Sequence, residues 1–329
     1  MKRNKILICT SANDRFTDGA ALLFYSLKKN FKAYGDCDFK VFHLILSDVA
    51  KQKIRDIEPR VQFEIPPDFD YCSGIKTLYG QDNQETYLCI ESFRQDDYDK
   101  VLWIDSDMLC ISDFSEILER TEPMLACLTK SNDFNTSASY NKSGVDKFNA
   151  GFMVINREHL EGKKTYQDLT AIIKKAKHAM ETSNKTPGAQ YYKVLHKKST
   201  TFNDQDAIRI YWTTRPTYIL PDWYNFKRFG TLGKFKSDDK FFRKNVDNVK
   251  IIHYAGKRKP WGNKTDRTLV TDDGVMPGKY DVCSVSDPEQ LNRCEAVHIW
   301  HDYYEECYGT LCTTDWYKHD KSLTWDSDD

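Results

Sequence analysis

Two carboxylates separated by one residue, Asp105 and Asp107, directly follow the apolar run 101–104. Acidic side chains at the end of a buried segment are costly unless a cation or hydrogen-bond donors compensate their charge. Carboxylate oxygens are ligands for hard divalent cations such as Mg2+ and Mn2+, which often keep substrate phosphates as their other ligands. The pair therefore indicates a metal site, although an Asp in a turn or helix cap gives the same local pattern.

A histidine followed by cations occurs later in the chain. His253 ends the apolar run 249–252, and Gly256 and three cations ending in Lys259 come within the next six residues. A lone His after a strand is more often structural than a ligand, but a Gly among clustered cations suits a phosphate-binding loop. Residues 221–260 carry eleven Lys or Arg against four Asp or Glu. That excess indicates either a solvated basic face or a phosphate-binding surface.

Two further polar clusters stand beside apolar elements. Asn149 and Gly151 open the apolar run 148–156, either as a turn into a strand or as an amide and bare backbone facing a ligand. Residues 203–206, Asn-Asp-Gln-Asp, precede the short helix expected at 207–212. One Asp would satisfy the helix cap and dipole, so the additional polar groups indicate a second role.

Short apolar runs alternate with amphipathic segments, which predicts an α/β fold with a doubly wound, mostly parallel sheet flanked by helices. Strands are expected at residues 6–9, 41–46, 61–65, 101–107, 124–128, 148–156 and 249–253. Helices are expected at residues 18–31, 50–57, 85–93, 113–120, 165–181, 207–212 and 296–308. Because ligands bind outside the carboxyl ends of strands in such a sheet, Asp105, Asp107 and His253 can together hold one cation there.

Composition excludes several classes of protein. The 329 residues carry a formal net charge of −1 and are 40% hydrophobic, which is typical of a soluble globular protein and gives no global field for nucleic acid. No window approaches the roughly 20 apolar residues of a membrane span, and the run 6–9 is too short for a signal-peptide core. Scattered cysteines fit buried, reduced thiols in a cytoplasmic protein. Cys283, Cys294, Cys307 and Cys312 cluster without the Cys-x-x-Cys spacing of a zinc site.

Four motifs together resemble glycosyltransferase family 8, which includes glycogenin and bacterial lipopolysaccharide galactosyltransferases. They are Asp105-Ser106-Asp107, the run 148–151, Asp204-Gln205 and the segment 253–261. They occur in the family's order over about residues 5–262. The resemblance implies a GT-A fold, a UDP-sugar donor, a Mn2+ ion (with Mg2+ as the alternative) and retention of anomeric configuration. It predicts a hexosyltransferase that moves a hexose or N-acetylhexosamine to a hydroxyl of a glycan or protein.

The resemblance also implies roles for single residues. The metal ligands are expected to be Asp105, Asp107 and His253. The nucleotide and diphosphate contacts are expected to be Thr10, Ser11, Asn13, Lys76, Asp105, Ser106, Gly151, Gly256 and Lys259. The catalytic groups around the donor sugar and acceptor are expected to be Asn149, Asp204 and Gln205.

One position departs from the family pattern. Members often have Arg or Lys where this chain has Cys89, so the donor-binding cation comes from Lys76 or Arg94 or is absent. This departure motivates a second hypothesis, a nucleotide-sugar-binding protein with little or no transfer activity. A third is a metal-dependent nucleotidyltransferase or phosphatase, since a fold does not fix chemistry. That class expects more acidic ligands or a Gly-rich phosphate loop, and the sequence shows no such loop.

The chain is expected to divide into a GT-A domain, residues 1–262, and an extension, residues 263–329. The extension has one aromatic helix and an acidic tail, with four Lys or Arg against fourteen Asp or Glu over residues 270–329. Packing on the transferase domain is the expected role of the helix, and acceptor binding is the alternative because aromatic faces stack on sugars. The assembly is left open between a monomer and a homodimer.

Overall fold

The computed structural model describes most of the chain. The described residues are 5–75, 84–128, 139–141, 148–183, 202–212, 215, 217–227, 235–255, 259–261, 292–312, 314 and 317. Two of the predicted site residues, Lys76 and Gly256, lie outside these ranges, as does the predicted acidic tail.

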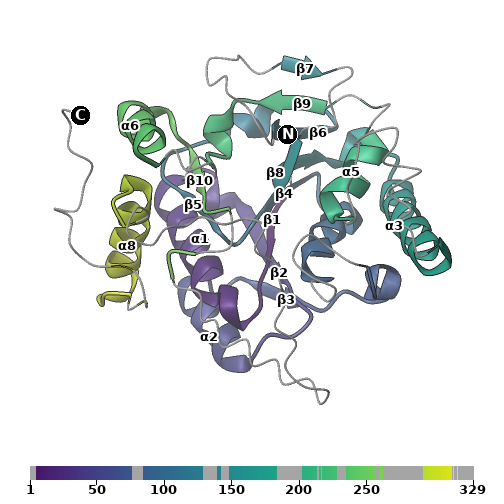
Figure 1. Cartoon of the computed structure of the whole chain (residues 1–329), viewed down its shortest axis with the longest axis horizontal. Coiled ribbons are helices and arrows are strands. Elements are labelled where there is room, and N and C mark those ends of the chain that lie inside the picture. Colours follow the sequence, from purple (N-terminus) through teal and green to yellow (C-terminus); the bar gives the residue numbers. More distant parts are fainter. Residues whose placement is uncertain are drawn as a thin grey trace.

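An eight-stranded sheet crosses the described part of the molecule in the order β3-β2-β1-β4-β8-β6-β9-β7 (Figure 1). Its strands are β1 (Ile6–Ser11), β2 (Cys37–Phe42), β3 (Gln62–Glu64), β4 (Lys100–Ile104), β6 (Met124–Leu128), β7 (Ser139–Asn141), β8 (Phe148–Asn156) and β9 (Thr217–Leu220). Neighbours pair in parallel except where β8 lies between β4 and β6 and where β7 joins β9. The predicted mostly parallel sheet is therefore confirmed.

Helices cover both faces of this sheet, as the alternation of side chains along a strand requires. In β4, Val101 and Trp103 face the side covered by η4 (Gln84–Arg94), α3 (Lys163–Ser183) and α5 (Asp204–Trp212). Leu102 and Ile104 face the opposite side, covered by α1 (Thr17–Asn30) and α2 (Asp48–Ile57). Figure 1 shows the two groups of helices on either side of the sheet. Each apolar strand is thus buried on both faces, which is why the strands read as continuous apolar runs.

The helix after β1 has the features that the sequence predicted. Its buried side chains include Ala20, Leu23, Phe24 and Leu27, spaced to form one apolar face. An acidic residue lies in its first turn and two lysines lie in its last turn, which complements the helix dipole. The observed bounds of α1 differ from the predicted 18–31 by one residue at each end.

A second, two-stranded sheet forms from β5 (Met108–Cys110) and β10 (Ile251–His253). The two strands are antiparallel, with His253 opposite Met108. The prediction that residues 249–253 form the last strand of the main sheet was therefore wrong. A short apolar run does not specify its partner, and the partner here is a strand that begins directly after the two predicted carboxylate ligands.

Other boundaries also differ from the predictions. The second strand is β2, which ends at Phe42, because its alternating face of Cys37, Phe39 and Val41 is buried while Ile45 is 82% exposed. The segments expected as helices at 85–93 and 113–120 are 3-10 helices, η4 and η5 (Ser115–Glu119). The elements β5, β7, β9 and α6 (Phe235–Asn245) were not predicted. The first residue of α5 is Asp204, so the predicted cap lies within its first turn.

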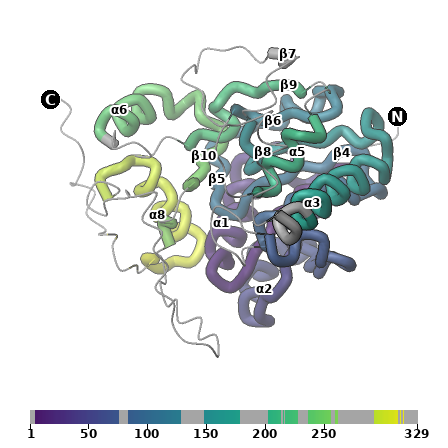
Figure 2. The backbone as a smooth tube through the Cα atoms, turned by 45° about the vertical axis from the view of Figure 1, so that its right-hand side comes forward, coloured from purple at the N-terminus to yellow at the C-terminus, as the bar shows by residue number. Residues whose placement is uncertain are grey.

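The aromatic helix α8 (Glu295–Tyr308) lies beside α1 and α6 (Figure 2). With β5 and β10 these helices enclose a third apolar cluster that includes Leu22, Leu109, Ile252 and Trp300. The helix therefore packs on the main α/β fold, as the sequence predicted. None of the helices in the described part of the chain is long and apolar enough to cross a membrane.

Candidate active site

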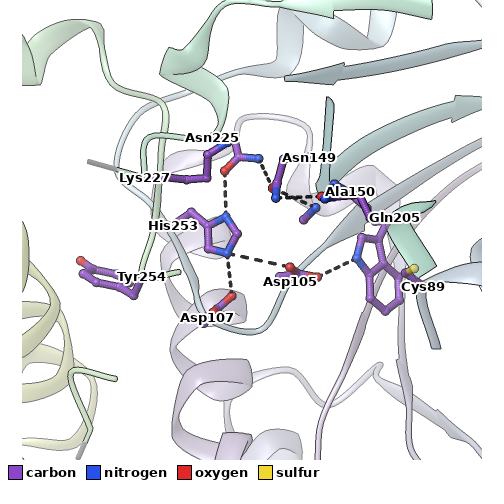
Figure 3. A network of polar contacts seen from close by, with 12 residues as sticks. Cys89, Asp105, Asp107, Asn149, Ala150, Gln205, Asn225, Lys227, His253 and Tyr254 are labelled. Carbon is purple, nitrogen blue, oxygen red and sulfur yellow. Dashed lines mark hydrogen bonds and ion pairs between the residues drawn. The ribbon is translucent and has the colours of Figure 1, made fainter. Parts of the chain in front are cut away.

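Asp105, Asp107 and His253 converge in space. One ligand atom from each lies within 4.8 Å of the other two. His253 Nε2 is 3.2 Å from Asp107 Oδ1 and 3.9 Å from Asp105 Oδ2 (Figure 3). Asp107 and His253 are buried, whereas 38% of the Asp105 side chain is exposed. The described residues contain this one cluster of three metal-ligand side chains.

The turn from β4 to β5 places both carboxylates. Asp105 N donates to Gly151 O at 2.8 Å, and Trp103 Nε1 donates to Asp105 Oδ1 at the same distance. On the other side, Tyr254 N donates to Asp107 O at 2.8 Å, which joins the turn to the end of β10. Two strands from distant parts of the sequence therefore deliver the three side chains to one point.

Gly151 lies where β8 bends over this turn. The pairing of β8 with β6 shifts register between Ala126 and Cys127, which marks a bulge at this point of the strand. A Cβ on Gly151 would lie 2.7 Å from Asp105 Oδ2 and 2.8 Å from His253 Cε1. A side chain would therefore displace two of the candidate ligands. The absence of a side chain at Gly151 allows Asp105 and His253 to lie close to the backbone of β8.

A chain of amide hydrogen bonds orients the imidazole of His253. Gly151 N, which can only donate, lies 3.1 Å from Asn149 Oδ1, so that oxygen is an acceptor. Asn225 Nδ2 donates to the same oxygen at 2.8 Å, which turns Asn225 Oδ1 toward His253 Nδ1, also at 2.8 Å (Figure 3). Nδ1 therefore carries a proton, and Nε2 is the ring nitrogen that faces the two carboxylates.

Asn225 was not predicted to belong to the site. It is completely buried and lies in the loop that follows β9, among aromatic residues. A single Asn without a characteristic spacing gives no signal in the sequence. Only the fold reveals that it joins His253 to Asn149.

Asp204 and Gln205, in the first turn of α5, lie on the other side of the site. Gln205 Oε1 accepts hydrogen bonds from Asn149 Nδ2 at 3.1 Å and from Ala150 N at 3.0 Å. Asp204 Oδ2 accepts one from Cys89 Sγ at 3.2 Å. Burial raises the pKa of Asp204 to about 7, although its hydrogen bond with Cys89 acts in the opposite direction. The three predicted catalytic residues thus lie together, next to the candidate ligands.

The two carboxylates differ in their electrostatics. Desolvation and the neighbouring Asp107 raise the pKa of Asp105. Desolvation also acts to raise the pKa of Asp107, but the nearby Lys259 and His253 outweigh it and leave that pKa well below its usual value. Lys259 Nζ contacts Asp107 Oδ2 and donates to Tyr254 O at 2.9 Å. The predicted diphosphate contact Lys259 therefore lies at the candidate metal site.

The donor set fits a hard or borderline divalent cation. Two carboxylates and one imidazole are ligands that Mn2+ and Mg2+ sites use. The imidazole has its second nitrogen held by Asn225, the arrangement that fixes the orientation of a ligating His. Three protein ligands leave coordination positions for other oxygens, such as those of a phosphate.

Three of the residues predicted to contact the nucleotide, Thr10, Ser11 and Asn13, lie at the end of β1 or just after it. β1 pairs in parallel with β4, and Cys9 lies opposite Trp103. The last two residues of β1, Thr10 and Ser11, therefore lie at the same edge of the sheet as Asp105. Thr10 Oγ1 is buried and has no hydrogen-bond partner among the described residues. Asn13 caps the 3-10 helix η1 (Asp14–Phe16) and contacts Glu85.

Arg94, one of the two cations expected to replace a basic residue at Cys89, does not face the site. It forms ion pairs with Glu64 at 2.6 Å and Glu91 at 2.9 Å. The prediction that Arg94 can supply the donor-binding cation was therefore wrong. Residues 87–93 of η4 are buried in the core. Arg94, at the end of η4, points to Glu64 of β3 and not to the candidate ligands.

Comparison with protein families gives one match that covers most of the chain. The model of glycosyl transferase family 8 matches residues 7–265. The chain belongs to glycosyl transferase family 8. A comparison with curated protein sequences found no significant match.

Solved structures share the fold of this family 8 chain at low sequence identity. The galactosyltransferase LgtC, solved in complex with donor and acceptor sugar analogs, is 16% identical with a TM-score of 0.52, over 93% of this chain and 96% of LgtC. The glycosyltransferase GlyE of Streptococcus pneumoniae TIGR4 is 15% identical with a TM-score of 0.53, over 91% of this chain and 60% of GlyE. The bifunctional glycosyltransferase WbbM is 20% identical with a TM-score of 0.52, over 79% of this chain. The chain spans about half, 47%, of WbbM. These likenesses show the GT-A fold.

Proposed function

We propose that this family 8 chain is a metal-dependent, retaining hexosyltransferase. It moves a hexose or N-acetylhexosamine from a UDP-sugar to a hydroxyl of a glycan or protein acceptor. The observation that carries the proposal is the convergence of Asp105, Asp107 and His253 beside Asn149 and Gln205 within a family 8 fold. Family membership favours sugar transfer over the nucleotidyltransferase and phosphatase hypothesis.

Asp105, Asp107 and His253 Nε2 would hold Mn2+, or Mg2+ in its place. When bound there, such a cation would supply positive charge against the leaving diphosphate. Lys259 adds a second positive charge beside Asp107, where negative charge develops as the sugar leaves. Gly256 lets the diphosphate approach the backbone, and Thr10, Ser11, Asn13, Lys76, Ser106 and Gly151 complete the nucleotide site.

Retention is proposed to follow a front-face route without a protein nucleophile. The nearest groups for a double displacement are Asp204 and Gln205, and an amide is a poor nucleophile. Two donors already hold Gln205 Oε1, so this oxygen is fixed in place to stabilise developing positive charge. Asn149 holds Gln205, and Asp204 orients the sugar hydroxyls. The leaving diphosphate takes the proton of the acceptor.

The remaining assignments concern the whole chain. Residues 1–262 form the GT-A catalytic domain, and residues 263–329 form an extension that packs on it through α8. The protein acts in the cytoplasm as a monomer or homodimer. Its donor is a nucleotide sugar, and its acceptor is a glycan or a protein. This follows by analogy with LgtC, whose structure holds donor and acceptor sugar analogs.

A panel of UDP-sugars, each incubated with Mn2+ and candidate acceptors, tests this function directly. Release of UDP together with a transferred sugar is expected, and proton NMR of the fresh product should show the anomer of the donor. Asp107→Ala should abolish turnover, whereas Asp48→Ala, at a fully exposed helix position, should not. Binding without release of UDP would instead support the nucleotide-sugar-binding protein. An inverted product would contradict the mechanism.

A further inference from the structure

The thiol of Cys89 lies inside the proposed sugar site. Cys89 is 2% exposed, and its Sγ donates to Asp204 Oδ2 at 3.2 Å. Figure 3 places Cys89 on the same side of the site as Gln205. The 3-10 helix η4 holds it there, since Tyr71 OH and Ser92 Oγ donate to the backbone carbonyls of Tyr87 and Cys89, at 3.5 Å and 2.5 Å respectively. The backbone that carries the thiol is therefore held in place at the edge of the proposed sugar site.

The groups that face Asp204 are neutral or acidic. Tyr87 and Cys89 face it from η4, Asp105 from the end of β4, and Asp206 from its own helix. No ion pair joins Asp204 to a cation among the described residues, and Arg94 is held by Glu64 and Glu91. The burial of this carboxyl is thus compensated by hydrogen bonds alone, and its raised pKa is consistent with that.

Hydrogen bonds to Asp204 leave part of its capacity unused. A carboxylate can accept about four hydrogen bonds, and two donors act on Asp204, the Cys89 thiol and the Gln205 backbone N–H. Sugar hydroxyls can donate to the remaining lone pairs. A donor sugar with its own carboxylate would instead meet like charge, which costs free energy in a site with little water.

We propose that Cys89 is a positioning residue which fixes Asp204 as an acceptor for the hydroxyls of an uncharged donor sugar, so that the site selects hexoses over uronic acids. The inference rests on the proposed function and names the substrate class of the same site. Because the Cys89 thiol donates to Asp204, its effect on the donor sugar passes through that carboxylate.

Calorimetric titration with UDP, UDP-glucose, UDP-galactose, UDP-glucuronate and UDP-galacturonate, all with Mn2+, tests the proposal. The wild-type protein should bind its preferred UDP-hexose at least about tenfold more tightly than the matching uronate. Cys89→Ala should retain the affinity for UDP and lose about tenfold in affinity for the hexose donor. Cys89→Ser, which keeps a donor, should restore most of that loss. Cys37→Ala, which removes a buried thiol far from this edge of the sheet, should change neither affinity.

A double-mutant cycle separates positioning from general packing. If Cys89 acts through Asp204, Cys89→Ala should have no further effect on hexose affinity in an Asp204→Asn background. Additive effects would overturn the proposal, as would equal affinities of the wild-type protein for hexose and uronate donors. Absence of UDP binding in the wild-type protein would overturn the proposed function and this inference together. Normal UDP binding with an unchanged preference in Cys89→Ala would overturn this inference alone.

Discussion

His253 Nδ1 donates to Asn225 Oδ1 at 2.8 Å, and this contact leaves Nε2 free to face Asp105 and Asp107. The assignment follows from the backbone N–H of Gly151, which fixes the orientation of both amides between it and the imidazole. A proton held on Nδ1 leaves Nε2 as the nitrogen that can bind a metal. Residues that hold a ligating His in this way contribute to metal affinity although they do not touch the metal.

Asn225→Ala should therefore lower the affinity for Mn2+ in the presence of UDP by about 10- to 100-fold. Titration followed by electron paramagnetic resonance of free Mn2+ measures this directly. Asn245→Ala is a suitable control, since it removes an amide that donates to the backbone of α6, at Phe241 O. Equal Mn2+ affinities of the two variants would show that Asn225 does not orient the ligand.

Gly151→Ala should damage the metal site more than the fold. The added Cβ would lie within 2.9 Å of Asp105 Oδ2, His253 Cε1 and Asn149 Oδ1, all of them side-chain atoms that can move. Their movement spoils the ligand geometry, so we expect Mn2+ affinity to fall by at least about tenfold. Gly35→Ala is the matched control, because a Cβ there has no atom within 4 Å. A wild-type Mn2+ affinity for Gly151→Ala would contradict the arrangement described here.

The sequence correctly predicted the elements that have a continuous apolar run or a clear amphipathic periodicity. The bounds of β6 and β8 were predicted to the residue, and those of α1 to within one residue at each end. The strand expected at 101–107 is β4, which ends at Ile104, before the two carboxylates. The two carboxylates and His253 were also found, because an acidic or imidazole group at the end of an apolar run is unusual. Local pattern and tertiary structure agree at these positions, so periodicity was sufficient.

The partners of these residues could not be found in the same way. Nothing local distinguishes the run 249–253 as a partner of β5 rather than of the main sheet. The contact of Asn225 with Asn149 and the contact of Cys89 with Asp204 join segments more than 70 residues apart in the sequence. Such contacts follow from the packing of the whole chain, which periodicity does not describe.

The raised pKa of Asp204 predicts a pH dependence of the reaction near neutrality. Burial raises this pKa to about 7, and an ionised carboxylate is the better acceptor for sugar hydroxyls. The value of kcat/KM for the donor should therefore rise as the pH passes upward through about 7, since this parameter reports ionisations of the free enzyme. Asp204→Asn should lower kcat/KM and remove this limb of the profile. A limb that persists unchanged in Asp204→Asn would assign it to another group.

The stability of the fold should also depend on the ionisation of Asp204, but it should fall as the pH rises, whereas kcat/KM should rise. The folded-state pKa of Asp204 lies above the value of about 3.9 expected in the unfolded chain. Its contribution to the free energy of unfolding is therefore full below pH 3.9 and is lost as the pH rises through about 7. The melting temperature of Asp204→Asn should fall less between pH 5 and pH 8 than that of the wild-type protein. An equal fall in both proteins would show that Asp204 is not buried as described.

Helix α8 should support the site through packing rather than through chemistry. Trp300 packs against Trp261, with ring centroids 5.6 Å apart, and Tyr254 OH donates to Ala296 O at 2.6 Å. Both contacts hold the segment that carries His253 and Lys259. Trp300→Ala should lower the free energy of unfolding by about 3–5 kcal/mol, measured by urea denaturation. Leu311→Ala, at a position 47% exposed near the same end of the chain, should change it by less than about 0.5 kcal/mol.

Removal of residues 320–329 should leave both UDP release and sugar transfer unchanged. The truncated chain keeps α8 and also Tyr317, which stacks on His301 with ring centroids 3.4 Å apart. The third apolar cluster, which α8 forms with α1, α6, β5 and β10, would then keep all of its described residues. Parallel assays of UDP release and of labelled acceptor test this. Loss of transfer with UDP release retained would instead assign acceptor binding to the end of the chain, since hydrolysis needs the donor site alone.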